Sequence, residues 1–335
     1  MTATAAAYTG AEARETQVTV DAAGAVMGGA TRFLVELRRY LGPDDGRGVR
    51  VIGEGRRISA GWLARRELVA ACERRVALNN VSFVSPGGER WVLLRNALHF
   101  LSDEEAREVG GAVTRRTRAI GTIAKAAALR ADCIVVPCSA MADRVAAALP
   151  GVRRRIAVRH HPVSADTMPA NDTPEHAVLC PVVFGGYKAI PARLRDLLSA
   201  AGQGGYRDVD LRVTAARDEL PPDLAGHPQV VALGRLPHTE LMSWWSRSAA
   251  VFFPTRVDSF GYPLAEARVY GRPVIAQDTA QAREIAGSAL CGYQAGEPGT
   301  LTAALERALK EQVTPDPAPF EPGSYFLWLL DGEPR

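Results

Sequence analysis

Short apolar runs alternate with amphipathic stretches along most of the chain. Within residues 30–41, Phe33, Leu34, Leu37 and Leu41 recur on one helical face, which predicts an amphipathic helix. Other runs have the length and apolar character of buried strands; in the first half of the chain they occupy 17–22, 48–53, 80–84, 90–94, 131–137 and 154–160. The alternation predicts a parallel sheet whose two faces are covered by helices.

The pattern breaks at 161–175, where proline and small polar residues dominate, and then restarts. Strand-like runs follow at 177–184, 208–215, 229–234, 249–254, 272–277 and 289–293, with helical stretches between them. We therefore expect an α/β protein with two Rossmann-like domains that face each other across a cleft. The expected parts are a flexible leader (1–15), an N-terminal domain (16–163), a linker (164–175), a C-terminal domain (176–313) and a tail that docks back on the body (314–335).

The chain has 335 residues, and its 40 basic and 37 acidic residues leave a net charge of +3. Charge this close to neutral gives no indication of a nucleic-acid partner. The basic stretch 115–130 would suit a peripheral membrane contact, but an ordinary solvated helix is the favoured interpretation. No apolar run approaches the roughly 18 residues of a membrane helix, and the first residues lack the features of a signal peptide. We expect a cytoplasmic protein.

Cysteine and lysine usage adds two expectations. The five cysteines are scattered without the short spacing of a zinc site, so we expect buried reduced thiols and no metal. Only three basic residues are lysines and 37 are arginines, a usage typical of a high-GC genome, and we expect an actinobacterial source. A lysine at a special position is therefore informative. Lys188 is such a case, because it follows an apolar run and a Gly-Gly turn and precedes a helix.

The stretch 251–278 combines the features of a ligand site. A strand ends at Pro254, Asp258 follows in a loop, and Pro263 suits the start of a helix that contains Glu266. The N-terminus of such a helix suits a phosphate, and ligands of parallel sheets bind at the carboxyl ends of the strands. Either carboxylate alone is explained as well by a structural role, since acids are favoured in turns and in first helical turns. Together they favour function.

Residues 258–278, DSFGYPLAEARVYGRPVIAQD, resemble the motif of the retaining glycosyltransferases of family 4, which have the GT-B fold. The spacing of the two acids is the same, and weaker similarity extends over 27–37, 131–145, 155–164 and 233–255. The resemblance implies a hexosyltransferase that takes its sugar from a UDP- or GDP-sugar and needs no cofactor or bound metal. It suggests a hydroxyl of a small molecule or glycan as acceptor, and natural-product biosynthesis is one such setting.

The resemblance also implies roles for individual residues. Glu266 accepts hydrogen bonds from the ribose hydroxyls, Asp258 holds hydroxyls of the donor sugar, and Lys188 binds the diphosphate. Near the carboxyl end of the strand at 90–94 lie Arg95, Asn96 and His99. Of these, the resemblance assigns His99 a contact with the donor sugar. Further donor contacts are implied for Gly28, Gly29, Leu236, Ser259, Phe260, Gly261, Tyr262 and Leu264, the last through its backbone N–H. For His160 and His161 a structural role is favoured.

The chain departs from the family pattern at two positions. Asp258 stands where the family usually has glutamate, and Val183 stands where it usually has arginine, a charge that Arg256 or another arginine would have to supply. Other interpretations therefore stay open: a phosphorylase or epimerase of the same fold, or a non-catalytic nucleotide-sugar-binding subunit. A nucleic-acid binder is the least favoured, because the arginines are spread along the chain and balanced by acids. For transfer, we hypothesise that the acceptor attacks on the face that the diphosphate leaves.

Overall fold

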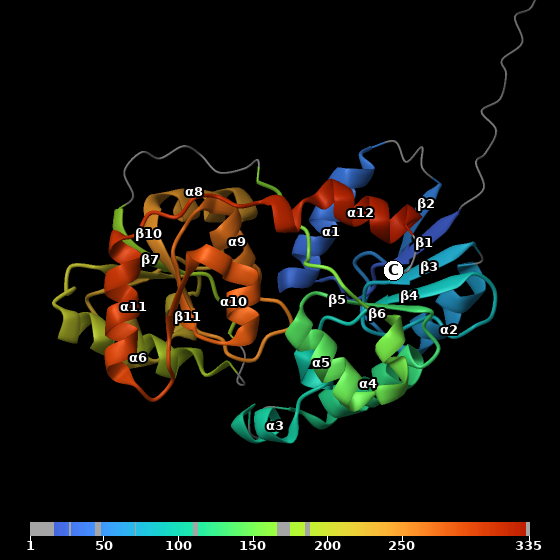
Figure 1. Ribbon diagram of the computed structural model, residues 1–335, viewed down its shortest axis with the longest axis horizontal. Coiled ribbons are helices and arrows are strands. Elements are labelled where there is room, and N and C mark those ends of the chain that lie inside the picture. The colour runs from blue at the N-terminus through green and yellow to red at the C-terminus, as the bar shows by residue number, and fades with distance from the viewer. Residues whose placement is uncertain are drawn as a thin grey trace, which may run out of the picture.

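The computed structural model describes residues 17–332 except residues 27, 44–47, 71, 110–112, 166–174 and 185–187. The predicted leader and most of the predicted linker lie outside the described residues, as does the Gly-Gly turn before Lys188. The molecule has two lobes, each built around one sheet (Figure 1).

The first lobe contains a parallel sheet of six described strands in the order β2-β1-β3-β4-β5-β6. Its strands are β1 (Val18–Asp21), β2 (Val49–Ile52), β3 (Arg74–Ala77), β4 (Glu89–Leu93), β5 (Cys133–Val136) and β6 (Ile156–Val158). Its α-helices are α1 (Gly28–Leu41), α2 (Ala60–Val69), α3 (Asp103–Val109), α4 (Arg115–Ala128) and α5 (Ser139–Ala148), and its short 3-10 helices are η1 (Ala97–His99) and η3 (Pro150–Arg155). The apolar face of α1, including Phe33 and Leu37, is buried against the sheet.

The second lobe repeats this architecture with strands in the order β12-β11-β10-β7-β8-β9. Its strands are β7 (Glu175–Cys180), β8 (Asp210–Val213), β9 (Val230–Ala232), β10 (Ser248–Phe253), β11 (Val274–Gln277) and β12 (Leu290–Tyr293). Its helices are α6 (Ile190–Gly204), α7 (Pro222–Ala225), α8 (His238–Arg247), α9 (Tyr262–Tyr270), α10 (Ala280–Ala286) and α11 (Pro298–Lys310), with the 3-10 turns η5 (Arg217–Glu219), η6 (Gly287–Ala289) and η7 (Ala318–Phe320). The predicted fold class, two Rossmann-like α/β domains, is confirmed.

The expected strand at 80–84 is wrong. The strand of this region is β3, and residues 81–84 form a loop whose apolar side chains Val81 and Phe83 are nonetheless buried. The carbonyls of Val81 and Ser82 accept hydrogen bonds from the guanidinium of Arg66 at 2.8 and 2.7 Å. These carbonyls therefore have a side-chain partner and do not join a neighbouring strand.

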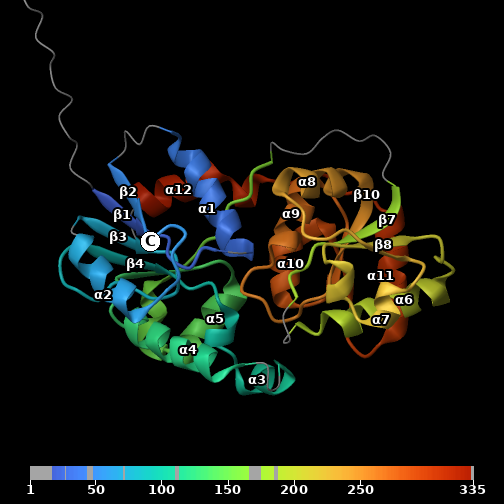
Figure 2. The same cartoon turned by 180° about the vertical axis from the view of Figure 1, so that it is seen from behind.

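The end of the chain returns to the first lobe. The helix α12 (Pro322–Asp331) lies beside α1 on the outside of the N-terminal sheet, far from the C-terminal sheet that precedes it in sequence (Figures 1 and 2). Phe326 contacts Phe33 edge-to-face with ring centroids 5.5 Å apart, and Trp328 lies 5.0 Å from Trp91. The helix thus completes the core of the N-terminal domain.

Several polar contacts join the two lobes. The carboxylate of Glu284 in α10 accepts hydrogen bonds from the backbone N–H of Ser139 at 3.0 Å and lies 3.2 Å from Nε2 of His160. The hydroxyl of Tyr270 donates to the carbonyl of Ser164 at 3.1 Å. These contacts set the relative position of the two sheets, whose strands end toward a shared cleft.

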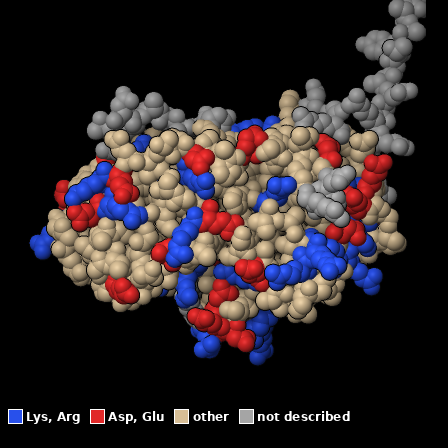
Figure 3. Space-filling model, in the orientation of Figure 1, with Lys and Arg blue, Asp and Glu red and all other residues tan. Residues whose placement is uncertain are grey.

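On the face shown in Figure 3, basic and acidic side chains are interspersed over both lobes. On this face neither the positive nor the negative charges gather into one large patch. Among the described helices, none combines the length and the apolar character needed to cross a membrane.

Candidate active site

A cleft of about 770 Å³ lies between the two lobes and is lined by residues of both. Its walls consist mainly of loops that follow strands: after β1, β3, β4 and β6 in the N-terminal domain, and after β7, β8 and β10 in the C-terminal domain. In each sheet the strand order reverses beside the first strand, between β1 and β3 and between β7 and β10. Ligands of open α/β sheets bind at such switch points, so this cleft is the expected site.

The C-terminal wall carries an ion pair that faces the cleft. Nζ of Lys188 lies 3.8 Å from Oδ2 of Asp258, and both side chains are largely buried. The other carboxylate oxygen of Asp258 accepts the backbone N–H groups of Ser259 at 2.7 Å and Phe260 at 3.2 Å. Asp258 therefore closes its own loop and positions Lys188, so its carboxylate is already engaged.

Glu266 lies deeper in the same wall, in α9, and is 6% exposed. Burial raises the pKa of its carboxyl above the usual range. The guanidinium Nε of Arg32, from α1 of the opposite domain, lies 3.6 Å from Oε1 of Glu266. Arg32 also lies 3.5 Å from Glu36, so one arginine bridges two carboxylates and joins the two walls.

Gly28 and Gly29 in the N-terminal wall are suited to glycine for different reasons, one of backbone conformation and one of space. Gly28 has a φ of +59°, in the left-handed region that favours glycine, and its Cβ position is open toward the cleft. At Gly29 a Cβ would lie 2.9 Å from the ring of Tyr262. The absence of a side chain at Gly29 thus lets the first residue of α9 pack directly on the opposite domain.

Most residues predicted for the site do line the cleft. Those that line it are Gly28, Gly29, Lys188, Leu236, Asp258, Ser259, Phe260, Gly261, Tyr262 and Glu266. Gly261 has a φ of +85° at the start of α9, where the chain turns from the loop into the helix. Two predicted residues, Leu264 and His99, are not among the lining residues.

Leu264 is buried, and its backbone N–H donates to the carbonyl of Gly261 at 2.9 Å. That N–H is used inside the first turn of α9, so the predicted contact with a diphosphate finds no support.

His99 ends the short helix η1, and its Nε2 lies 3.1 Å from Nδ2 of Asn96. Its backbone and Cβ pack against Gly121 of α4, and burial lowers the pKa of its imidazole to about 4. The turn of η1 directs Asn96 and Leu98 to the cleft and His99 to the interior.

Sequence and structure comparisons agree with this geometry. Residues 185–311, which cover most of the C-terminal domain, match the family described as "Glycosyl transferases group 1". This match assigns residues 185–311 to the group 1 glycosyltransferases. No curated protein matches the chain in sequence.

Solved structures of low sequence identity share the GT-B fold with this chain. Sucrose-phosphate synthase from Thermosynechococcus elongatus is 14% identical, with a TM-score of 0.62 over 94% of this chain and 95% of that one. WaaG, a glycosyltransferase involved in lipopolysaccharide biosynthesis, is 12% identical, with a TM-score of 0.63 over 88% and 90%. A UDP-forming α,α-trehalose-phosphate synthase from Burkholderia vietnamiensis is also 12% identical, with a TM-score of 0.60 over 95% and 97%.

The cleft has further residues that were not assigned a role from the sequence. Arg95 and Asn96 follow β4 directly, and His161 lies shortly after the end of β6. The rule that ligands bind at the carboxyl ends of strands points to Arg95 and Asn96, whereas the resemblance favoured His99. For His161, which is 2% exposed, sequence favoured a structural role, but the residue lines the cleft.

The arginine that the family places at Val183 has no direct substitute in Arg256. Arg256 is exposed, points to Glu104 at 3.9 Å, and is not among the residues lining the cleft. The arginines that do line it are Arg32, Arg95 and Arg235. Arg32 and Arg95 belong to the N-terminal wall, whereas Arg235, like Lys188, belongs to the C-terminal wall, so positive charge enters the cleft from both domains.

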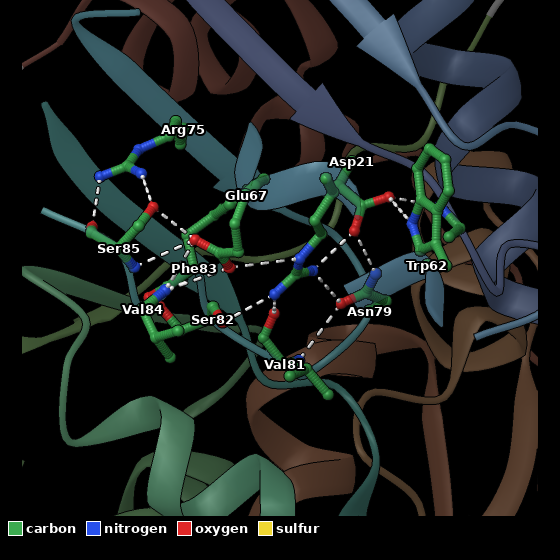
Figure 4. Close-up of polar contacts among 12 residues, drawn as sticks. Asp21, Trp62, Glu67, Arg75, Asn79, Val81, Ser82, Phe83, Val84 and Ser85 are labelled. Atoms are coloured by element: carbon green, nitrogen blue, oxygen red, sulfur yellow. Dashed lines mark hydrogen bonds and ion pairs between the residues drawn. The ribbon is translucent and has the colours of Figure 1, made fainter. Parts of the chain in front are cut away.

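A buried polar network holds the N-terminal wall in place (Figure 4). Asp21, the last residue of β1, accepts hydrogen bonds from Trp62 at 3.1 Å, Asn79 at 2.7 Å and the guanidinium of Arg66 at 2.6 Å. The same arginine holds the loop after β3. Since Asn79 lines the cleft, the network fixes the loops after β1 and β3 relative to each other.

Among the described residues, no cluster of three or more His, Cys, Asp or Glu side chains is arranged to hold a metal ion. Asp208 and Asp210 form an Asp-x-Asp sequence, but they lie at the amino end of β8, away from the cleft, and contact His176 and Arg212. The five cysteines are free thiols.

Proposed function

We propose that this chain is a retaining transferase that moves a hexose from a UDP- or GDP-sugar to a hydroxyl of a small-molecule or glycan acceptor. The observation that carries the proposal is the position of Lys188. It lies at the switch point of the C-terminal sheet, next to the loop 258–261 and the N-terminus of α9, and it faces the cleft. A cation and a helix N-terminus at this place together suit a diphosphate.

Lys188 would stabilise the charge that develops on the leaving diphosphate. As the bond between the anomeric carbon and the phosphate oxygen breaks, the electron pair stays on that oxygen. Lys188 approaches this charge with its ammonium, and the backbone N–H groups at the start of α9 add their partial charge. Asp258 keeps Lys188 in place and prevents it from folding away from the cleft.

Retention follows from attack on the departing face. The acceptor oxygen forms its bond to the anomeric carbon on the side that the diphosphate leaves, through a state with oxocarbenium character. A non-bridging oxygen of the leaving diphosphate takes the acceptor proton, so no protein carboxylate is needed as base. Asp258 and Glu266 are both engaged in ion pairs, which agrees with this assignment.

The two walls also limit hydrolysis of the donor. Tyr262 packs against Gly29 and stacks on His161 of the opposite domain, with ring centroids 5.8 Å apart. Glu266 pairs with Arg32 beside this contact. Apposition of the domains at these points excludes water from the floor of the cleft.

A thermal-shift screen against UDP, GDP and their common hexose conjugates tests the proposal. We expect stabilisation by one nucleotide series and its strong reduction in Lys188→Ala. The exposed Lys310, which pairs with Glu306 in α11, provides the matched control Lys310→Ala. Release of nucleoside diphosphate that depends on an added acceptor identifies transfer. Tight donor binding without release across a broad acceptor panel identifies a binding subunit, and absence of stabilisation by either nucleotide contradicts the proposal.

A further inference from the structure

In the N-terminal wall, polar side chains that line the cleft pack against the buried ring of Phe33. Arg95 places its guanidinium 5.0 Å from the centroid of the Phe33 ring, and His161 lies 5.3 Å from it, edge-on. Tyr262, from α9 of the C-terminal domain, stacks on His161 with ring centroids 5.8 Å apart. Arg95, His161 and Tyr262 all line the cleft, and we refer to them as the Phe33 cluster.

Arg95 has no carboxylate partner among the described residues. Its Nε donates to the carbonyl of Leu78 at 2.9 Å, while its Nη1 is shielded from solvent and finds no hydrogen-bond partner within the described residues. Burial lowers the pKa of its guanidinium, which nonetheless stays charged because an arginine pKa is so high. A largely buried cation without a counter-charge is costly, and a π-face and one carbonyl offset only part of that cost.

His161 and Tyr262 add further unused donors. Both ring nitrogens of His161 and the hydroxyl of Tyr262 are buried without a partner in the part of the chain that the structure describes. Burial keeps the pKa of His161 well below its ordinary value, so its imidazole is neutral and one ring nitrogen carries a proton. The great majority of buried polar groups in proteins are hydrogen-bonded, so three adjacent exceptions that face a cleft call for a ligand.

The chemistry of the cluster selects that ligand. A guanidinium, a phenol and an imidazole N–H are hydrogen-bond donors, and Glu266, which follows Tyr262 by one turn of α9, is engaged by Arg32. Carboxylate and phosphate groups accept several hydrogen bonds at once and supply the missing negative charge. We propose that the Phe33 cluster binds an anionic oxygen group, a carboxylate or a phosphate, carried by the donor sugar or by the acceptor.

This inference rests on the proposed function, because it places the anionic group on one of the two substrates. The proposed anionic group is distinct from the diphosphate of the donor. Lys188 and the N-terminus of α9 lie on the C-terminal wall, whereas the Phe33 cluster lies on the N-terminal wall and at its contact with Tyr262. A uronic acid donor and a phosphorylated acceptor are the two sources of this chemistry. Neutral hexoses and unphosphorylated acceptors leave the cluster unsatisfied.

The test uses inorganic phosphate as probe, titrated by calorimetry against the full chain saturated with UDP or GDP so that the site of Lys188 is occupied. We expect Arg95→Met to weaken phosphate binding ~10-fold or more, because it removes the charge. Arg95→Lys should weaken binding less, because it keeps the charge and replaces only the bidentate fork by a point charge. Tyr262→Phe keeps the packing on Gly29 and His161 and removes one donor, so we expect a loss of about 3- to 10-fold.

Arg235→Met is the matched control, since Arg235 also lines the cleft but pairs with Glu219 on the opposite wall. Its phosphate affinity should equal that of the wild type. If Arg95→Met does not fold, Tyr262→Phe decides. The proposal is overturned if the folded variants bind phosphate as the wild type does, or if Arg95→Met weakens binding of the nucleoside diphosphate itself as much as Lys188→Ala does.

Two substrate pairs then identify the source. A preference for UDP-glucuronate over UDP-glucose that disappears in Arg95→Met assigns the anionic group to the donor sugar. A preference for glucose 6-phosphate over glucose, measured with nucleoside diphosphate present and abolished in the same variant, assigns it to the acceptor. Failure of any nucleotide to bind would instead refute the proposed function, and phosphate binding without nucleotide would still report on the cluster.

Discussion

The two walls of the cleft are built in different ways. The C-terminal wall takes most of its residues from one stretch, from Phe253 to Glu266, where a strand, a loop and a helix N-terminus follow one another. The N-terminal wall collects residues from five separate loops, after β1, β2, β3, β4 and β6. In the C-terminal wall Lys188 pairs with Asp258, and Glu266 pairs with Arg32 across the cleft. In the N-terminal wall, Nη1 of Arg95 and both ring nitrogens of His161 lack a hydrogen-bond partner within the described residues. The first wall thus resembles a finished site for a fixed ligand, and the second a site completed by its substrate.

The largest expected effect comes from the C-terminal wall. Lys188→Ala removes the cation beside the leaving diphosphate and should lower kcat by ~10²- to 10³-fold, the usual effect of losing one preorganised electrostatic group. Steady-state kinetics with the identified donor measure it. Lys310→Ala should leave kcat unchanged, and an equal loss in both variants would show that the effect is not local to the cleft.

Asp258 separates loop support from contact with the sugar. Asp258→Asn keeps an oxygen that accepts the N–H groups of Ser259 and Phe260, whereas Asp258→Ala removes it. We expect a loss of roughly 10- to 30-fold in kcat/KM for alanine, equal to the free energy of one or two hydrogen bonds, and a clearly smaller loss for asparagine. Equal and large losses in both variants would assign the negative charge of Asp258 a direct role at the donor sugar.

The pair of Arg32 and Glu266 joins the walls. Arg32→Met leaves the carboxylate of Glu266 buried without its cation, and we expect the free energy of unfolding to fall by about 2 kcal/mol. The double variant Arg32→Met/Glu266→Gln should recover part of the loss, since it removes the unpaired charge as well. Denaturant unfolding of the four proteins measures the coupling. Additive losses would mean that the two side chains do not interact.

Buried histidines of the N-terminal domain make stability depend on pH. In the fold the pKa of His99 is lowered from 6.5 to about 4, so on unfolding the residue takes up a proton at any pH between these values. Stability should therefore decline as pH falls from about 6.5 to 4, by up to about 1.4 kcal/mol per pH unit for this residue. His99→Leu should flatten the decline, while His176→Asn, at an exposed position, should not. An unchanged slope in His99→Leu would contradict the burial of a neutral imidazole.

The same contrast explains how far the sequence could predict the molecule. The alternation of apolar runs and helical stretches predicted the fold class, because parallel strands buried on both faces are uniformly apolar. Asp258, Glu266 and the residues between them were found because they are contiguous. By contrast, 81–84 has the apolar alternation of a strand, and only the side chain of Arg66, distant in sequence, shows why it is a loop.

The N-terminal wall could not be predicted in this way. Whether Asn96 or His99 faces the cleft depends on one turn of η1, and this is decided by the packing of His99 on Gly121. Within the described residues, Nη1 of Arg95 and both ring nitrogens of His161 are buried without a hydrogen-bond partner. No sequence pattern indicates this, because it depends on how the chain packs around these side chains. Domain boundaries and the roles of individual site residues stay predictions.

Calorimetric titration of UDP and GDP into the wild type, Lys188→Ala and Arg95→Met tests the division between the walls most directly. If the C-terminal wall holds the diphosphate, Lys188→Ala should weaken nucleotide binding ~10-fold or more, because the variant cannot form the charge-assisted hydrogen bond to the phosphate. Arg95→Met should stay within about 2-fold of the wild type, since its side chain lies on the other wall. Unchanged affinity in Lys188→Ala, or an equal loss in Arg95→Met, would contradict this division.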